Sequence, residues 1–153
     1  MRHIRPWIES GGHFVTQYHR PIDNWDKTQS APLRLQPGSP SIRWRVTDAA
    51  ATVRTLQPDH PLLNSPNRIT NEDFDGWVKE RGLYFASEWD PAYVPLLAMS
   101  DTDEAPLEGS LLAARIGAGS HVHCALNLFY QMDHMVVGAF RLFANLMTPS
   151  GRT

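Results

Sequence analysis

The sequence has a single cysteine and no long apolar run, and these two absences exclude several classes of protein. The 153-residue chain carries only Cys124, so it forms no internal disulfide bond and no cysteine-rich zinc module. None of its apolar stretches approaches the roughly 18 residues that a membrane-spanning helix needs. Residues 1–7, MRHIRPW, contain no continuous apolar segment of the kind that starts a secretory signal, so we expect a cytoplasmic protein.

An excess of charge of one sign is also lacking. Fourteen Lys and Arg face sixteen Asp and Glu, which leaves a net charge of −2 and no general electrostatic affinity for nucleic acid. What the chain does have is 42% hydrophobic residues in a length that suits one domain. We therefore expect one folded unit with an apolar core.

The spacing of apolar residues predicts an α/β unit at the start of the chain. Apolar side chains follow the i, i+3, i+4 spacing of a helix face over 4–10. Gly11-Gly12 ends this helix, and the β-branched and aromatic run at 13–18 predicts a strand. A helix followed directly by a strand is the building block of α/β folds.

The middle of the chain predicts short elements separated by turns. Thr70 is followed three residues later by Asp73, which approximates a capping box and predicts a helix over 71–80. Apolar alternation predicts strands at 33–35, 41–46, 52–56 and 83–85, with a loop at 86–93.

The last third of the chain gives the clearest pattern. It predicts a strand at 94–99, an antiparallel hairpin from 111–116 and 121–128 around a Gly-rich turn, and a helix over 138–147. Together the elements predict a single α/β domain over 1–153. In it, a mainly parallel sheet is flanked by helices, with the hairpin at one side.

Two histidines in the predicted hairpin raise the possibility of a metal site. On a strand, His121 and His123 point to one face, roughly 6.5 Å apart, and suit zinc or copper if a third ligand such as His134 joins them. The alternative is a half-exposed strand without metal. Cys124 points to the opposite face, and we expect it to be buried and slow to react. Gly117-Ala118-Gly119 lies in the hairpin rather than between a strand and a helix, so we predict no cofactor.

The loops contain the residues that we predict for ligand binding. Tryptophan beside charged groups suits stacking on sugars, although packing in a core is the commoner role of tryptophan. Loops at strand ends carry function in open α/β sheets. The candidate ligand-binding residues are Trp25, His60, Asn64, Asn67, Arg68 and Trp89.

Several strings of the sequence carry a family resemblance. They are DHPLLNSPNRIT at 59–70, DFDGWV at 73–78, ERGLYF at 80–85 and GAFRLFANL at 138–146. These strings resemble the C-terminal region of bacterial PIG-L (LmbE-like) deacetylase family proteins. There, a glutamine-amidotransferase-like domain, similar to ThuA-like domains, follows the deacetylase domain. The resemblance covers nearly the whole chain.

The resemblance implies a partial doubly wound fold, of the flavodoxin-like, class I glutamine amidotransferase-like kind, that lacks its N-terminal strands. The family's zinc motif, His-Pro-Asp-Asp, has no counterpart here, because His60-Pro61 is followed by Leu62-Leu63. The amidotransferase triad is also unmatched. The expected function is a non-catalytic accessory module of a zinc-dependent N-acetyl-sugar deacetylase, for substrate presentation or domain packing. The alternatives are a stand-alone carbohydrate-binding module and a metal-dependent hydrolase centred on His121 and His123.

The expected partners follow from the predicted sheet. If its first strands are absent, the strand at 13–18 has an edge that is able to pair. We expect a deacetylase domain or a second copy of the chain at this edge. Carbohydrate is a further possible ligand, and neither nucleic acid nor a membrane is expected.

Overall fold

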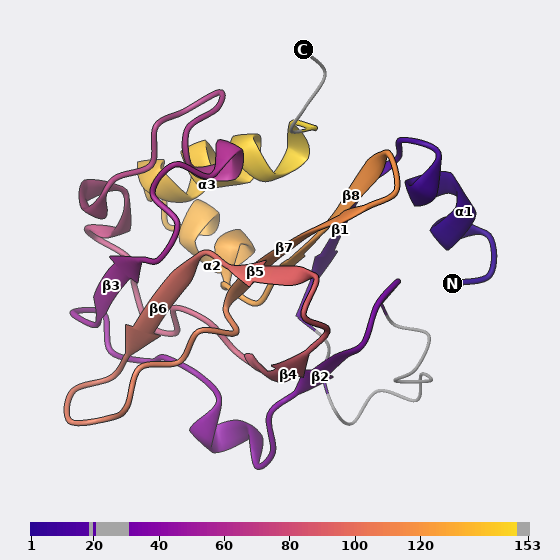
Figure 1. Cartoon of the computed structure of the whole chain (residues 1–153). Helices are drawn as coiled ribbons and strands as arrows, with labels where there is room; N and C mark the ends of the chain where they lie inside the picture. The colour runs from indigo at the N-terminus through magenta and orange to yellow at the C-terminus, as the bar shows by residue number, and fades with distance from the viewer. Residues whose placement is uncertain (19, 21–30, 150–153) are drawn as a thin grey trace.

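A four-stranded sheet forms the centre of the protein in a computed structural model, which describes residues 1–18, 20 and 31–149 (Figure 1). The strand order is β1 (His13–Gln17), β8 (Gly119–Cys124), β7 (Leu111–Ile116) and β5 (Tyr93–Pro95). β1 runs parallel to β8, whereas β8 with β7 and β7 with β5 are antiparallel. The sheet is therefore mixed.

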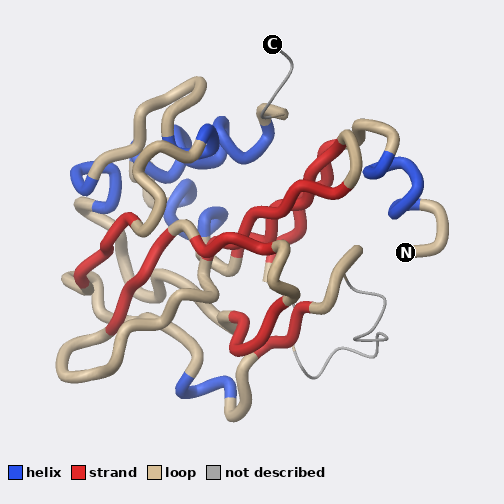
Figure 2. The backbone as a smooth tube through the Cα atoms, in the orientation of Figure 1, coloured by secondary structure: helices blue, strands red, loops and turns tan. Residues whose placement is uncertain are grey.

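Two smaller antiparallel sheets accompany it (Figure 2). One pairs β2 (Leu35–Pro37) with β4 (Ala86–Trp89), and the other pairs β3 (Thr52–Thr55) with β6 (Leu97–Ser100). The helices among the described residues are short. They are α1 (Ile4–Glu9), α2 (Leu128–Asp133), α3 (Val137–Met147) and the 3-10 helices η1 (Ser41–Arg43), η2 (Pro61–Leu63) and η3 (Asn71–Phe74). None of these described helices has the length and apolar character needed to cross a bilayer.

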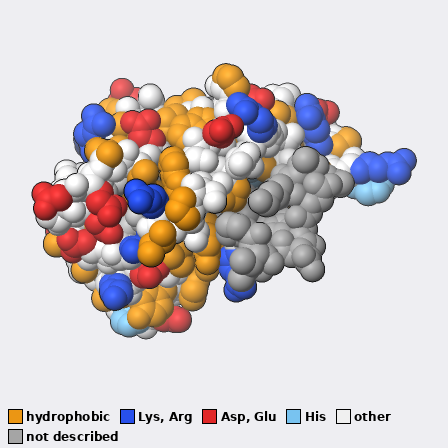
Figure 3. Space-filling model, turned by 90° about the horizontal axis from the view of Figure 1, so that it is seen from below, with side chains coloured by type: hydrophobic (Ala, Val, Ile, Leu, Met, Phe, Trp, Pro, Cys, Tyr) orange, Lys and Arg blue, Asp and Glu red, His pale blue; other side chains and the backbone are white. Residues whose placement is uncertain are grey.

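The central sheet separates two hydrophobic clusters. Because successive strand side chains point to opposite faces, Ala113 and Val122 pack on one face with Leu142 of α3, while Leu112 faces the other side with Leu35 of β2. In Figure 1, α2 and α3 accordingly lie above the sheet and β2 and β4 lie below it. Seen from below, acidic and basic side chains are interspersed among hydrophobic ones (Figure 3).

The prediction of an α/β domain is confirmed, but the prediction of a mainly parallel sheet is wrong. The hairpin of β7 and β8 lies in the middle of the sheet rather than at one side. A turn as short as the one between β7 and β8 can join only antiparallel strands. Because this hairpin forms the middle of the sheet, the pair of β1 and β8 is the one parallel pairing of this sheet among the described residues.

The helix predicted over 71–80 is wrong in extent. The capping box of Thr70 and Asp73 is present, but it starts only the 3-10 turn η3. Gly76 then adopts a φ of +71°, which ends helical geometry. The indole of Trp77 turns inward instead and donates a hydrogen bond to the Asp73 carbonyl oxygen at 2.8 Å.

Several strand predictions also need correction. The segment 41–46 forms η1 followed by an isolated bridge at Val46, and 83–85 is not a strand. The strand predicted over 94–99 is divided into β5 and β6, and the predicted loop 86–93 contains β4. These segments pair with partners far away in the chain, which local alternation does not reveal.

Candidate functional site

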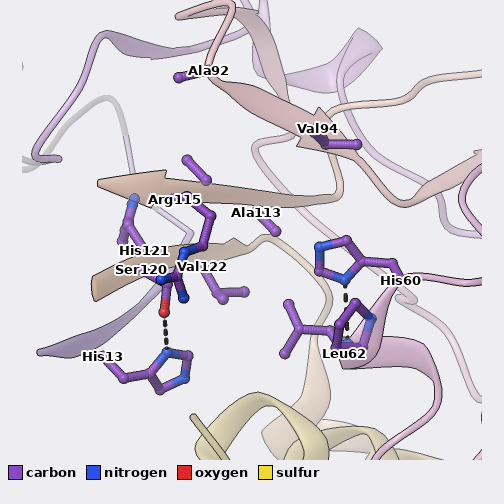
Figure 4. Close-up of a pocket in the computed structure, with 12 residues that line it drawn as sticks. His13, His60, Leu62, Ala92, Val94, Ala113, Arg115, Ser120, His121 and Val122 are labelled. Carbon is purple, nitrogen blue, oxygen red and sulfur yellow. Dashed lines mark hydrogen bonds between the residues drawn. The ribbon is translucent and has the colours of Figure 1, made fainter. Parts of the chain in front are cut away.

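A pocket of about 420 Å³ lies against the α3 side of the central sheet (Figure 4). Its apolar lining includes Val94 of β5, Ala113 of β7, Val122 of β8 and Leu62 of η2. The pocket therefore lies between three strands of the sheet and the loop that contains η2. Polar groups enter it from two sides.

The first polar group is a serine–histidine pair. The parallel register places His13 of β1 directly beside Ser120 of β8, so their side chains share a face. Ser120 Oγ lies 2.7 Å from His13 Nδ1, and His13 Nε2 lies 2.6 Å from the Leu146 carbonyl oxygen at the end of α3. Because a carbonyl only accepts, Nε2 donates, and Nδ1 of the neutral ring accepts the hydrogen bond from the Ser120 hydroxyl.

The second polar group is His60, which lies across the pocket from His13 (Figure 4). His60 caps η2, since its Nδ1 accepts a hydrogen bond from the Leu62 backbone N–H at 3.2 Å. Burial lowers the pKa of His60, which favours the neutral ring. With Nδ1 accepting, the hydrogen of the neutral ring is on Nε2, which makes this atom a donor.

Among the predicted ligand-binding residues that the structure describes, only His60 lines this pocket. Asn64 Nδ2 donates to the Pro58 and His60 carbonyl oxygens, and the Asn67 amide bonds Asn145 and the Arg141 carbonyl oxygen of α3. These contacts close the loop and attach it to the helix.

Two of the other predicted residues lie away from the pocket, and one falls outside the described residues. The Arg68 carbonyl oxygen accepts a hydrogen bond from Arg141, again within the loop contacts to α3. Trp89 lies in β4 and packs against the cluster on the opposite face of the sheet. Trp25 belongs to a segment that the structure does not describe.

His121 and His123 share one face of β8, as predicted, and His121 is also among the residues that line the pocket. Both rings contact the Thr16 hydroxyl, with His121 Nε2 at 2.9 Å and His123 Nδ1 at 3.1 Å. His121 Nδ1 also bonds the Tyr93 hydroxyl at 2.6 Å, and both histidines are fully buried. His134, the proposed third ligand, is instead exposed at the end of α2.

The described residues contain no group of three or more His, Cys, Asp or Glu side chains suited to hold a metal ion. Cys124 lies in the core on the other face of β8, as its alternation with His123 predicts, and burial raises the pKa of its thiol to about 12. The thiol is therefore protonated at neutral pH.

Comparison with known proteins adds no family to this geometry. No model of a protein family, no curated protein and no solved structure matches the chain. The function is therefore proposed from the residues of this chain and their geometry.

Sequence reasoning missed the pair of Ser120 and His13. The two residues are 107 positions apart and meet only because β1 pairs in parallel with β8. The one local signal was that each follows a glycine beside a strand, Gly12 before β1 and Gly119 at the start of β8. That signal does not predict which strands pair.

A second feature lies at the outer edge of β1. Within the described part of the chain, β1 pairs with β8 alone, so it is an edge strand. A hollow of about 660 Å³ lies beside it, lined by Trp7 of α1, Val15 of β1 and Met147 of α3 among others. The indole of Trp7 is 52% exposed there.

The helix α3 exposes an apolar stripe in addition to its buried one. Ala139, Leu142 and Leu146 are buried in the core, while the stripe of Phe140, Phe143 and Met147 is 37–54% exposed. Hydrogen bonds from Arg141 and Asn145 attach another side of α3 to the loop of η2 and η3, which leaves the exposed stripe on the side away from that loop. An exposed apolar stripe next to an edge strand is typical of an interaction surface.

Proposed function

We propose that this chain is an accessory α/β module that a partner domain completes at the β1 edge. The observation that carries the proposal is the meeting of three features at one place: the unpaired edge of β1 in the described chain, the hollow beside Trp7, and the exposed stripe of Phe140, Phe143 and Met147. Each feature alone is common, but together they describe a surface that suits a strand and a helix.

The chemistry of the edge supports this proposal. His13–Gln17 contains no Lys, Arg, Asp, Glu or Pro, and these are the residues with which proteins usually block an exposed edge. The parallel pairing of β1 with β8 favours a further parallel strand, and such a strand needs a crossover helix that packs on the sheet. In this proposal that helix lies against the exposed stripe of α3, and the added strand extends the parallel part of the sheet in the way that doubly wound, flavodoxin-like folds do.

The partner that we propose is a deacetylase domain of the PIG-L type. Its support is the resemblance carried by 59–85 and 138–146, which implies a neighbouring domain that removes N-acetyl groups from sugars with zinc. In this arrangement the zinc chemistry belongs to the partner. This chain supplies packing and presents the substrate.

The experiment is co-purification of the chain with a PIG-L-type deacetylase domain, followed by analytical ultracentrifugation. A one-to-one complex is expected, and the substitutions V15K and F143E should each weaken it at least tenfold. I42E is the matched control, because Ile42 is 67% exposed on η1, away from this surface. A chain that stays monomeric with the domain present contradicts the proposal, and a complex that V15K and F143E leave unchanged contradicts the assigned surface.

A further inference from the structure

The geometry of the pocket on the α3 side of the sheet suggests an activity of this chain itself, in addition to the proposed docking of a partner domain. We propose that Ser120 is a nucleophile, that His13 is its general base, and that the pocket accepts small esters of short aliphatic acids. This proposal does not depend on the partner domain.

The serine–histidine pair has the arrangement that activates a hydroxyl. Nucleophilic serines act when a base lies within hydrogen-bond distance and a third group orients that base. His13 Nδ1 is 2.7 Å from Ser120 Oγ, and the Leu146 carbonyl oxygen orients the ring through Nε2 at 2.6 Å. The direction of these hydrogen bonds places the accepting lone pair of Nδ1 at the serine proton.

His60 supplies a hydrogen-bond donor on the side of the pocket opposite Ser120. The Leu62 backbone N–H occupies Nδ1 of His60, so the free hydrogen is on Nε2. His60 lies across the pocket from Ser120, with the apolar lining between them (Figure 4).

The shape and lining of the pocket define the substrate class. Its walls of Val94, Ala113 and Val122 suit an aliphatic acyl chain, and about 420 Å³ accommodates a small ester. Arg115 also lines the pocket, so the lining includes one cationic side chain beside Ser120 and His60.

The reaction proceeds in two balanced steps. Ser120 Oγ forms a bond to the acyl carbon while its proton passes to His13 Nδ1, and the carbonyl oxygen becomes an oxyanion. Collapse of this tetrahedral intermediate breaks the bond between the acyl carbon and the alkoxy oxygen, and the alcohol leaves with the proton from His13. Water then attacks the acyl group on Ser120 with His13 again as base. This step releases the carboxylic acid and restores the serine hydroxyl.

The test combines a covalent probe with a substrate assay on the intact chain. A fluorophosphonate should modify Ser120, identified by mass spectrometry, and p-nitrophenyl butyrate should be hydrolysed. S120A should abolish both signals, and H13Q should lower the hydrolysis rate by about 10²–10⁴-fold. S87A is the matched control and should match the natural protein, because the half-buried Ser87 lies outside the pocket and its hydroxyl donates to the Gln36 carbonyl oxygen.

A further variant keeps the test decisive if H13Q disturbs the end of α3. S120C should react with iodoacetamide much faster than the natural protein, whose thiol at Cys124 is buried in the core. A folded natural protein that the probe does not modify, or hydrolysis that persists in S120A, overturns the proposal.

Discussion

At the scale of single residues, Asp101 shows how one carboxylate stabilises two loops. It accepts hydrogen bonds from the Thr47 and Asp48 backbone N–H groups at 2.8 Å and from the Thr47 hydroxyl, and Arg45 lies 3.8 Å away. Burial acts to raise the pKa of Asp101. The hydrogen bonds from Asp48 and Thr47, together with Arg45, outweigh burial and lower it.

We therefore predict that D101N destabilises the protein by about 1.5–3 kcal/mol at pH 7. A pKa that is lower in the folded than in the unfolded state gives stability that is fully present above the unfolded value of about 3.9. This stability is lost as the pH falls through the folded value. Urea unfolding between pH 7 and pH 3 measures this, and the difference between the two proteins should shrink towards the acid end. D103N, at an exposed neighbour, is the control and should change stability by less than about 0.5 kcal/mol.

The thiol of Cys124 gives a second prediction at this scale. Its side chain is 1% exposed, and burial raises its pKa to about 12, so the reactive thiolate is scarce and inaccessible. Labelling of the native protein with a thiol reagent at pH 7.5 should be slow and should accelerate in urea as the core opens. Complete labelling within the mixing time, without urea, is the contrary result.

At the scale of elements, the contact of α3 with η3 depends on Gly138. A Cβ atom at this position would lie 1.8 Å from the Asp73 carbonyl oxygen, so the helix approaches η3 more closely than an alanine permits. Replacing glycine by alanine inside a helix usually stabilises a protein by up to about 1 kcal/mol. Here we predict the opposite sign.

G138A should destabilise the protein by about 1–3 kcal/mol, because backbone atoms must move apart to accept the new methyl group. Thermal unfolding followed by circular dichroism measures the change. V137A is the control at the adjacent position, where the side chain is 71% exposed, and it should be nearly neutral. Equal effects of the two substitutions would contradict the contact.

Asn145 connects α3 to the loop of η2 and gives another prediction about elements. Its fully buried amide donates to the Leu62 and Asn67 carbonyl oxygens at 2.9 and 2.7 Å and accepts from the Asn67 backbone N–H. N145A leaves these backbone groups without their partner, so we expect a loss of about 2–4 kcal/mol. In N145A, the Asn67 amide should exchange its hydrogen faster than in the natural protein. The amides of β7 should exchange only as fast as the lower global stability of N145A accounts for.

At the scale of the whole molecule, the proposed docking surface predicts a change in one tryptophan. Trp7 is 52% exposed beside the β1 edge, so acrylamide quenches its fluorescence in the free chain. Binding of the partner domain should cover the indole, reduce quenching and shift the emission to shorter wavelength. The same titration with W7F should lack this change, and an unchanged signal from the natural protein in a complex would place the interface elsewhere.

The sequence by itself determined the elements whose signals are local. Apolar spacing and the Gly11-Gly12 stop predicted α1 and β1, the short Gly-rich turn predicted the β7–β8 hairpin, and the stripe at 138–147 predicted α3. The capping pair of Thr70 and Asp73 also formed as predicted. These signals suffice because each depends on residues within a few positions of one another.

The tertiary structure decided what depends on residues far apart in the chain. The helix expected over 71–80 gave way because Trp77 gains more by packing in the core than by extending a short helix. The position of β1 beside β8 brought Ser120 to His13, and the loop of η2 brought His60 to the same pocket. Strand pairing across a hundred residues is set by the burial of both sheet faces together, and no local pattern encodes that choice.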